Sequence, residues 1–215
     1  MIYKDLILII PAYNEESSIG HIVEEARKIA KVLVVDDCST DATLNILIKK
    51  QVDFVRNRIN QGYDKTILIG LQNAIKLNYK YAITIDADGQ HKICDVSRVY
   101  ERLNDGCEIV LAERKNLQRF GEKAFSFITK ILWGIRDPLT GMKGYKLDYI
   151  NKNKIKKYYD SVGTYMLMVA IKKKGKIGLI NIETNKRNGE STFGNGIRIN
   201  IKILNALILG ITIAC

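Results

Sequence analysis

The sequence predicts an α/β protein with a doubly wound, mostly parallel sheet and helices on both faces. Two observations support this fold class. Short apolar segments alternate with amphipathic segments as far as residue 113, and only a few residues link one segment to the next. The apolar segments are continuous, which is typical of strands that are covered on both faces. Such alternation with short links predicts parallel strands joined by crossover helices.

The individual elements follow in order along the chain. The first strand is expected at residues 5–10, DLILII, and Pro11 ends it. The next segment, residues 17–30, carries its apolar residues on one helical face, and Ser17 or Ser18 can cap its start. The same reasoning predicts strands at 31–37, 52–57, 81–86 and 107–113, and helices at 39–50, 63–78 and 93–105.

The C-terminal segment differs from the rest of the chain. Residues 1–196 are expected to form one domain, and residues 197–215 an amphipathic-to-apolar helix whose last charge is Lys202. As a helix, the apolar stretch 203–215 spans only ~20 Å, against ~30 Å for the hydrocarbon core of a bilayer. The helix could lie in a membrane surface, where Arg198 and the cluster KKKGK would favour anionic lipid. A core helix and a homodimer contact remain open alternatives.

Composition limits the partners and the compartment. The 215 residues carry a formal net charge of +11, from 34 Lys and Arg against 23 Asp and Glu. A surface of this charge attracts anions such as nucleic acid, anionic lipid or phosphorylated substrates. The four cysteines form no CxxC pair and no disulfide framework, and the N-terminus shows no export signal. We therefore expect reduced thiols in a cytoplasmic protein.

Acidic residues follow two of the predicted strands. Asp36 and Asp37 end one strand, and Asp86 and Asp88 end another. The carboxyl ends of parallel strands meet at one edge of a sheet, where ligands bind in this fold class. Carboxylates gathered there repel one another unless a cation lies between them, and oxygen ligands suit Mg²⁺ or Mn²⁺. The alternative is structural, because DADG could be a tight turn around Gly89.

Several motifs in order along the chain resemble one known family. They are IPAYNEE at 10–16, VVDDCSTDAT at 34–43, DADGQH at 86–91, DPLTGMKGYK at 137–146 and RNGEST at 187–192. Together they resemble the family 2 glycosyltransferases, which have the GT-A fold. Within that family the sequence is most similar to the polyprenyl-phosphate glycosyltransferases, the group typified by dolichol-phosphate mannosyltransferase.

The resemblance implies a donor site for a nucleotide-diphosphate sugar with a bound divalent metal. Asp88 corresponds to the direct metal ligand, with Asp86 and Gln90 as further metal or phosphate contacts, while no role is expected for His91. The positions that correspond to the family's nucleotide-binding residues are Pro11, Tyr13, Glu15, Val35, Asp37, Asp86 and Ala87. A tyrosine ring can stack on a base, and a carboxylate can accept from a ring N–H or a ribose hydroxyl.

The resemblance also implies cationic contacts to the diphosphate and the acceptor. Arg114 corresponds to a family arginine near both, and a guanidinium offers a fixed fork of donors with a permanent charge. The group often has paired arginines followed by a serine, whereas this chain has RFGEKAFSFITK, a departure that leaves the acceptor open. The residues that correspond to acceptor or diphosphate contacts are Arg114, Arg119, Lys123, Ser126, Arg187 and Ser191.

The chemistry implied by the family is a single displacement at the anomeric carbon, with inversion. A lipid phosphate has a second pKa of about 6 and needs little help from a base. A sugar hydroxyl needs a general base, and Asp137 is the candidate for that role. A third reading, a non-catalytic nucleotide-sugar-binding subunit or a nucleic-acid binder, is disfavoured because the acidic edge would repel nucleic-acid phosphate.

Overall fold

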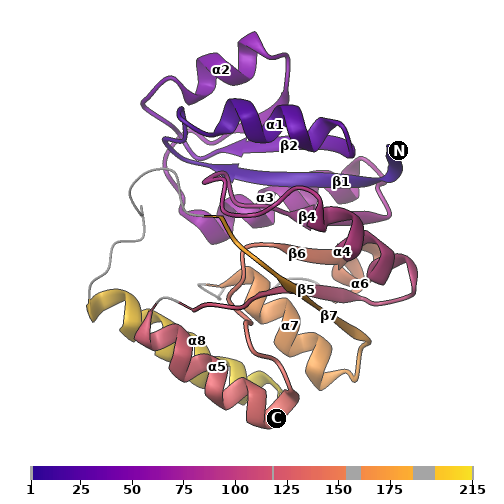
Figure 1. The fold of residues 1–215 in the computed structure, drawn as a ribbon, viewed down its shortest axis with the longest axis vertical. Helices are drawn as coiled ribbons and strands as arrows, with labels where there is room; N and C mark the ends of the chain where they lie inside the picture. Colours follow the sequence, from indigo (N-terminus) through magenta and orange to yellow (C-terminus); the bar gives the residue numbers. More distant parts are fainter. Residues whose placement is uncertain (1, 118, 154–160, 186–196, 215) are drawn as a thin grey trace.

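The described part of the chain forms a seven-stranded sheet with helices on both faces (Figure 1). The computed structural model describes residues 2–117, 119–153, 161–185 and 197–214. The strands are β1 (Tyr3–Ala12), β2 (Ala30–Asp36), β3 (Asp53–Arg56), β4 (Tyr81–Thr84), β5 (Ile109–Arg114), β6 (Lys143–Lys146) and β7 (Ile177–Ile182). The helices are α1 (Ile19–Arg27), α2 (Thr43–Lys49), α3 (Tyr63–Lys76), α4 (Asp95–Asn104), α5 (Phe120–Trp133), α6 (Leu147–Lys152), α7 (Val162–Lys172) and α8 (Ile197–Ala214).

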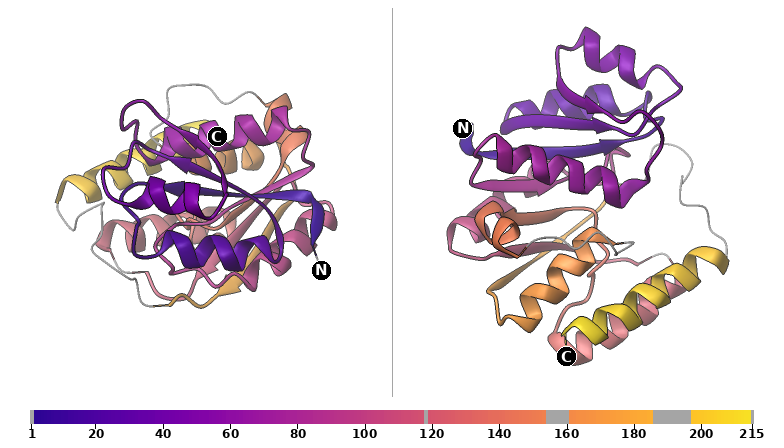
Figure 2. Two further views of the ribbon diagram at one scale, coloured as in Figure 1. Left: turned by 90° about the horizontal axis from the view of Figure 1, so that it is seen from above. Right: turned by 180° about the vertical axis from the view of Figure 1, so that it is seen from behind.

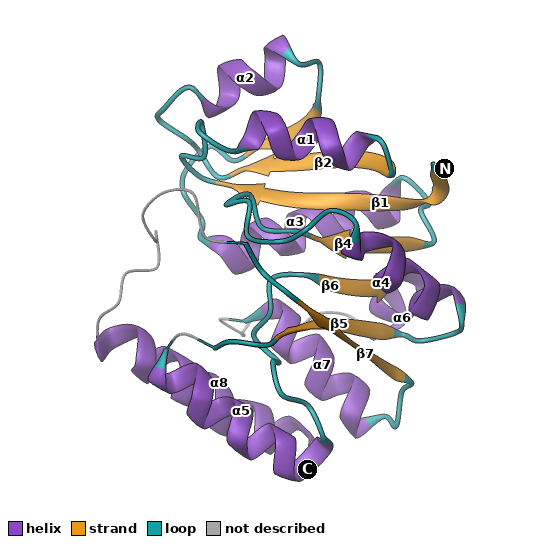
Figure 3. Ribbon diagram, in the orientation of Figure 1, coloured by secondary structure: helices purple, strands orange, loops and turns teal. Residues whose placement is uncertain are grey.

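The sheet is parallel apart from one strand (Figure 3). The strand order is β3-β2-β1-β4-β6-β5-β7, and β6 runs antiparallel to both of its neighbours, β4 and β5. Adjacent strands elsewhere in the sheet are parallel. The carboxyl ends of β1, β2, β4 and β5 therefore share one edge, which we call the carboxyl edge.

Alternate residues of the central strand β1 contribute to two separate cores. Leu6, Leu8 and Ile10 belong to the core that packs against α1, α2 and α4, whereas Ile7 and Ile9 belong to the core on the other face. That second core includes buried residues of α3, α6 and α7. These three helices lie on the side of the sheet that faces the viewer in the right-hand view of Figure 2. Burial of both strand faces explains why β1 appears in the sequence as an unbroken apolar run.

The predicted elements as far as residue 114 are confirmed, with boundaries that shift by a few residues. One expectation was wrong, because β1 continues through Pro11 to Ala12. The carbonyl of Ile9 accepts the Ile85 N–H, so Ile9 and Pro11 direct their backbone groups toward the β4 side. Pairing with β4 ends at Ile9, and the missing N–H of Pro11 therefore leaves no partner unsatisfied.

The sequence did not predict the elements between residue 114 and α8. Strand β6 has the sequence KGYK and lacks the apolar run that marks the other central strands. It is stabilised by pairing on both sides, with β4 and β5. Tertiary contacts therefore determine this strand more than its local sequence does.

The C-terminal helix α8 packs against the domain. It lies beside α5 and α7 at the β5–β7 end of the sheet (Figure 2). Leu207 is 3% exposed, and Gly210 lies against the side chain of Met168 on α7. These contacts favour the core-helix alternative for this part of α8. Within the described ranges, no helix combines the length and the hydropathy needed to cross a bilayer.

Candidate active site

The carboxyl edge brings the sequence motifs together from four strands. The loop after β1 carries Tyr13 and Glu15, and hydrogen bonds tie it to its neighbours. Ser18, at the start of α1, donates its hydroxyl to the Ala87 carbonyl at 2.6 Å and lies 3.1 Å from a Glu15 carboxylate oxygen. Ser17 or Ser18 was expected to cap α1. Ser18 is the N-cap residue, but its side chain makes no capping bond. It joins this loop instead to the Asp-Ala-Asp segment at residues 86–88, which we call the D-x-D loop.

The two aspartates at the end of β2 hold the end of β3 and the loop that follows it. Asp37 is 3% exposed, and its carboxylate accepts from the Asn57 amide at 2.7 Å and from the Gln61 and Gly62 N–H groups at 2.9 and 2.8 Å. Asp36 forms an ion pair with Arg56 at 3.2 Å. Asp37 thus has a clear structural role in shaping the wall of the site.

Asp86 is fixed from three sides. One carboxylate oxygen accepts from the Tyr63 hydroxyl at 2.7 Å, and the other lies 3.4 Å from His91 Nε2. A Cβ on Gly141 would lie 1.8 Å from Asp86 Oδ2, so glycine is required for this approach. Burial alone would raise the pKa of Asp86, but His91, Tyr63 and Arg114 outweigh it and lower the pKa to about 2. Asp86 is therefore an oriented carboxylate at neutral pH.

Asp88 lies in the turn that follows. Asp88 is only 6% exposed, and its Oδ1 accepts the Gln90 N–H at 3.0 Å. In the part of the chain that the structure describes, no three His, Cys, Asp or Glu side chains form a ready-made metal cage. One or two carboxylates with substrate phosphates are the usual ligands of Mg²⁺, and the oxygen donors of Asp86, Asp88 and Gln90 fit that chemistry.

Arg114, at the end of β5, is paired with Asp137. Its Nε donates to Asp137 Oδ2 at 2.7 Å, and its NH2 group donates to Oδ1 at 3.0 Å. Burial would lower the pKa of Arg114, but the contact with Asp137 and the charges of Glu122 and Asp86 raise it, so the guanidinium stays charged. Asp137 is 1% exposed and both of its oxygens accept from Arg114. This geometry argues against the expected role of Asp137 as a general base, which needs access to the acceptor.

The start of α5 adjoins this pair. Glu122 lies 3.8 Å from the Arg114 guanidinium and accepts from Arg119 at 3.1 Å. Glu113 accepts the backbone N–H groups of Arg136 and Asp137. Two buried glutamates therefore hold the segments that carry the arginines.

The remaining predicted contacts divide into two groups. Lys123 is exposed and Ser126 partly exposed on α5, one turn or more beyond Arg119. Arg187 and Ser191 lie outside the described residues. The structure thus brings Arg114 and Arg119 to one end of α5, while Lys123 and Ser126 follow along that helix.

Four residues near the site were not predicted from the sequence. They are Tyr63, His91, Glu122 and Lys143, all of which contact or adjoin predicted site residues. His91 was expected to have no role, yet it lies against Asp86, and its position in DADGQH was the available signal. Glu122 and Lys143 also lie within quoted segments, RFGEKAFSFITK and DPLTGMKGYK, whereas Tyr63 lies outside every motif and no local pattern marks it.

Lys143 is a buried cation whose charge interacts with those of Asp137 and Asp86. It is 6% exposed and donates its ammonium group to the Thr140 carbonyl. Burial lowers its pKa to about 8, although the charges of Asp137 and Asp86 partly offset this effect. A buried ammonium group with a lowered pKa destabilises the folded state while it is protonated.

Replacing Lys143 by methionine tests this effect through its pH dependence. An unfolded lysine keeps its proton up to about pH 10.4, so between about pH 8 and pH 10 the unfolded state binds more protons and the wild type gains stability as the pH rises. The unfolding free energy of the wild type relative to Lys143→Met should increase over this range by on the order of 3 kcal/mol. Urea unfolding at several pH values measures it. A difference that stays constant over this pH range would contradict the assignment.

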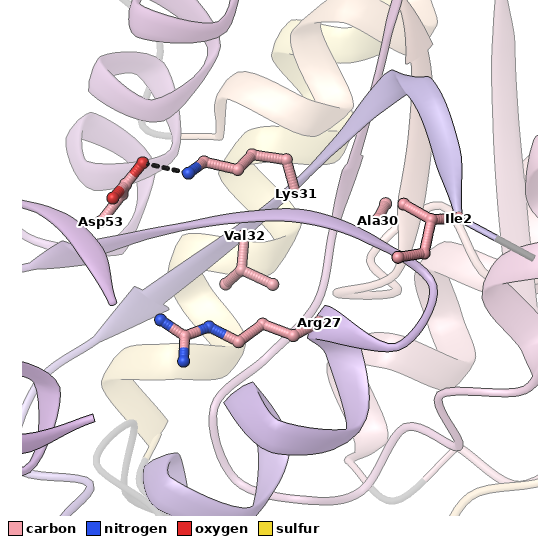
Figure 4. Close-up of a pocket in the computed structure, with 6 residues that line it drawn as sticks. All are labelled: Ile2, Arg27, Ala30, Lys31, Val32 and Asp53. Atoms are coloured by element: carbon pink, nitrogen blue, oxygen red, sulfur yellow. Dashed lines mark ion pairs between the residues drawn. The ribbon is translucent and has the colours of Figure 1, made fainter. Parts of the chain in front are cut away.

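A pocket at the opposite edge of the sheet is unrelated to this site (Figure 4). Its charged side chains are already paired, because Lys31 contacts Asp53 at 2.5 Å and Arg27 donates to the Lys50 carbonyl at 2.7 Å. The lining residues are Ile2, Arg27, Ala30, Lys31, Val32 and Asp53, near the amino ends of the strands. Among the described residues, the acidic residues that follow β2 and β4 lie at the carboxyl edge instead.

Comparison with known families agrees with this arrangement. The sequence matches the family described as "Glycosyl transferase family 2" over residues 7–160, which is more than half of the chain. The chain is a family 2 glycosyltransferase. The matched region contains the D-x-D loop, the Arg114–Asp137 pair and the loops after β1 and β2.

Relatives of this glycosyltransferase have been named in archaea. It is 29% identical to the UDP-N-acetylglucosamine–dolichyl-phosphate N-acetylglucosaminyltransferase of Methanococcus voltae, over 96% of each chain. It is 25% identical to the dolichyl-phosphate hexose transferase of Haloferax volcanii, over 69% of each chain.

Solved structures confirm the GT-A fold of this glycosyltransferase. The glucosyl-3-phosphoglycerate synthase of Mycobacterium tuberculosis, crystallised with Mn²⁺, UDP and glucosyl-3-phosphoglycerate, superposes with a TM-score of 0.76. The match covers 95% of this chain and 79% of that one at 17% identity, a similarity that establishes the fold alone.

Proposed function

We propose that this glycosyltransferase moves a sugar from a nucleotide-diphosphate donor to a polyprenyl phosphate at the cytoplasmic face of a membrane, with Mg²⁺ or Mn²⁺ and with inversion. The observation that carries the proposal is the bidentate pair of Arg114 and Asp137, because it leaves a buried permanent cation and no accessible base at this position. The names of the archaeal relatives support the same acceptor class.

The donor would bind along the carboxyl edge. The ring of the half-buried Tyr13 would stack on the base, and Glu15 would accept from the base or ribose. The neighbouring positions Pro11, Val35, Asp37 and Ala87 would enclose it. Asp88, with Asp86 and Gln90, would hold the divalent metal, which when bound offsets negative charge on the diphosphate.

The reaction would be one displacement. A phosphate oxygen of the acceptor attacks the anomeric carbon, the bond from that carbon to the diphosphate oxygen breaks, and the nucleoside diphosphate departs with the electron pair. Arg114 stabilises the charge that develops on the phosphates, and Asp137 keeps its guanidinium in position. The acceptor phosphate would be bound by Arg119, Lys123 and Ser126, with Arg187 and Ser191 as proposed partners from the segment outside the described residues.

Two alternatives are weaker. Transfer to a saccharide hydroxyl needs a base, and Asp137 has both oxygens engaged by Arg114. A non-catalytic sugar-nucleotide-binding subunit is disfavoured because the named archaeal relatives are transferases.

An acceptor assay separates these functions. Incubation with labelled nucleotide sugars, UDP sugars first, Mn²⁺ and a polyprenyl phosphate should yield a labelled product that extracts into organic solvent. Dephosphorylated polyprenol is the matched control and should give none, because a hydroxyl lacks the charge that Arg114 and its neighbours bind. Label transferred to saccharides but never to lipid would reject the proposed acceptor.

A further inference from the structure

The outward face of α5 is unusually apolar for a surface helix. Phe120, Phe127 and Ile131 are 77%, 67% and 67% exposed, and Leu132 is 50% exposed. Spacings of seven and four place the first three on one helical face. The opposite face packs Phe125 into the second core, so α5 is apolar on both sides.

This surface is a cluster and not a set of scattered residues. Other large exposed hydrophobic residues in the described chain occur singly, such as Ile48 on α2 and Leu77 directly after α3. Helix α8 packs beside α5 at the same end of the molecule (Figure 1), and it carries the exposed residue Ile208. Isolated exposed apolar residues are ordinary, whereas a contiguous group marks an interaction surface.

The charges around the cluster indicate its partner. Lys123 and Lys130 are exposed and flank the apolar residues at helical spacing. The acidic residue of α5, Glu122, is 5% exposed and turned toward Arg114 and Arg119. The outward face of α5 thus presents apolar and cationic groups, which suits the surface of an anionic bilayer. A second copy docked symmetrically on this face would bring like charges together.

We propose that α5 lies in the surface of an anionic membrane, with Phe120, Phe127 and Ile131 among the acyl chains and Lys123 and Lys130 at the headgroups. The proposal rests on the proposed function in one respect, that the acceptor is a membrane lipid. Because α5 begins at Arg119 beside Arg114, this orientation would place the lipid phosphate next to the site while its chain stays in the bilayer. It places the membrane contact on α5, whereas the sequence offered residues 203–215 for it as one of three alternatives.

Vesicle sedimentation tests the proposal with matched variants. The variant Phe127→Gln with Ile131→Gln replaces two exposed apolar residues by a good helix former, and Ile48→Gln with Leu77→Gln does the same elsewhere on the surface. With vesicles of phosphatidylcholine and phosphatidylglycerol, the first pair should lose at least about tenfold in partitioning and the second pair should bind like the wild type. Lys130→Gln should lose about fivefold.

Two results would overturn the proposal. One is equal vesicle binding by the wild type and both double variants. The other is a wild type that does not bind vesicles but sediments as a dimer, while the double variant Phe127→Gln with Ile131→Gln sediments as a monomer. That result would identify a second copy of the chain as the partner. Vesicle binding is measured independently of turnover. A protein that binds vesicles through α5 but transfers no sugar would therefore refute the proposed function and still support this inference. With a short, water-soluble polyprenyl phosphate, the α5 variant should keep wild-type turnover.

Discussion

Replacing Asp88 by asparagine should lower sugar transfer by about 1,000-fold or more while the protein stays folded, because removing a metal-binding charge forfeits several kcal/mol of transition-state stabilisation. The amide oxygen of asparagine can still accept the Gln90 N–H that Asp88 accepts at 3.0 Å, so the turn should survive. Turnover is measured with the lipid acceptor and the donor identified in the acceptor assay. Binding of Mn²⁺ together with the nucleoside diphosphate is measured by calorimetry and should weaken in parallel.

A control at the same edge is available in Asp41. Its carboxylate also accepts backbone N–H groups, from Glu16 and Thr43 at 3.0 and 2.9 Å, but it lies outside the D-x-D loop. Asp41→Asn should retain most of the activity and all of the metal affinity. Full activity in Asp88→Asn, or an equal loss in both variants, would refute the metal role of Asp88.

Replacing Gly141 by alanine should disable the site without touching a charged residue. The new Cβ would lie 1.8 Å from Asp86 Oδ2, 2.4 Å from its Cγ and 2.6 Å from its Oδ1, so the carboxylate must move away from Tyr63 and His91. A displacement of this size at a reacting centre lowers turnover by about 100-fold. Overpacking should also lower the free energy of unfolding by about 1–3 kcal/mol.

Gly20→Ala provides the comparison for this variant. Its Cβ would meet only the flexible end of Lys50, at 3.0 Å, and the side chain of Ile46 at 3.4 Å. Activity and stability should stay near wild type. If Gly141 acts through Asp86, the double variant Gly141→Ala with Asp86→Ala should turn over no more slowly than Asp86→Ala alone. An additive further loss would show that the alanine damages something else.

The agreement between sequence and structure is strongest where local pattern and burial coincide. Strands β1, β2 and β4 are buried on both faces and alternate with one-sided helices, so their apolar runs identify them directly. Asp36 ends β2, while Asp37 follows β2 and Asp86 and Asp88 follow β4, and parallel pairing brings them to one edge by topology alone. The family resemblance added the roles of these residues, which their spacing could not supply.

The sequence did not predict contacts between segments that are far apart along the chain. Tyr63 precedes Asp86 by 23 positions and Asp137 follows Arg114 by the same number, yet each pair is in hydrogen-bond contact. The local sequence does not indicate whether Asp137 acts as a general base or as the partner of a buried arginine. Only its burial and its bidentate contact favour the second role.

By itself the sequence determined the order of strands and helices as far as residue 114, the acidic edge and the enzyme family, because periodicity and motif order are local properties of the chain. The tertiary structure decided the antiparallel insertion of β6, the pairing of Arg114 and the exposure of the apolar face of α5. These features depend on which segments pack together. An apolar helix has the same sequence whether its faces are covered or bare, so only the packed fold shows which face of α5 is left for a partner.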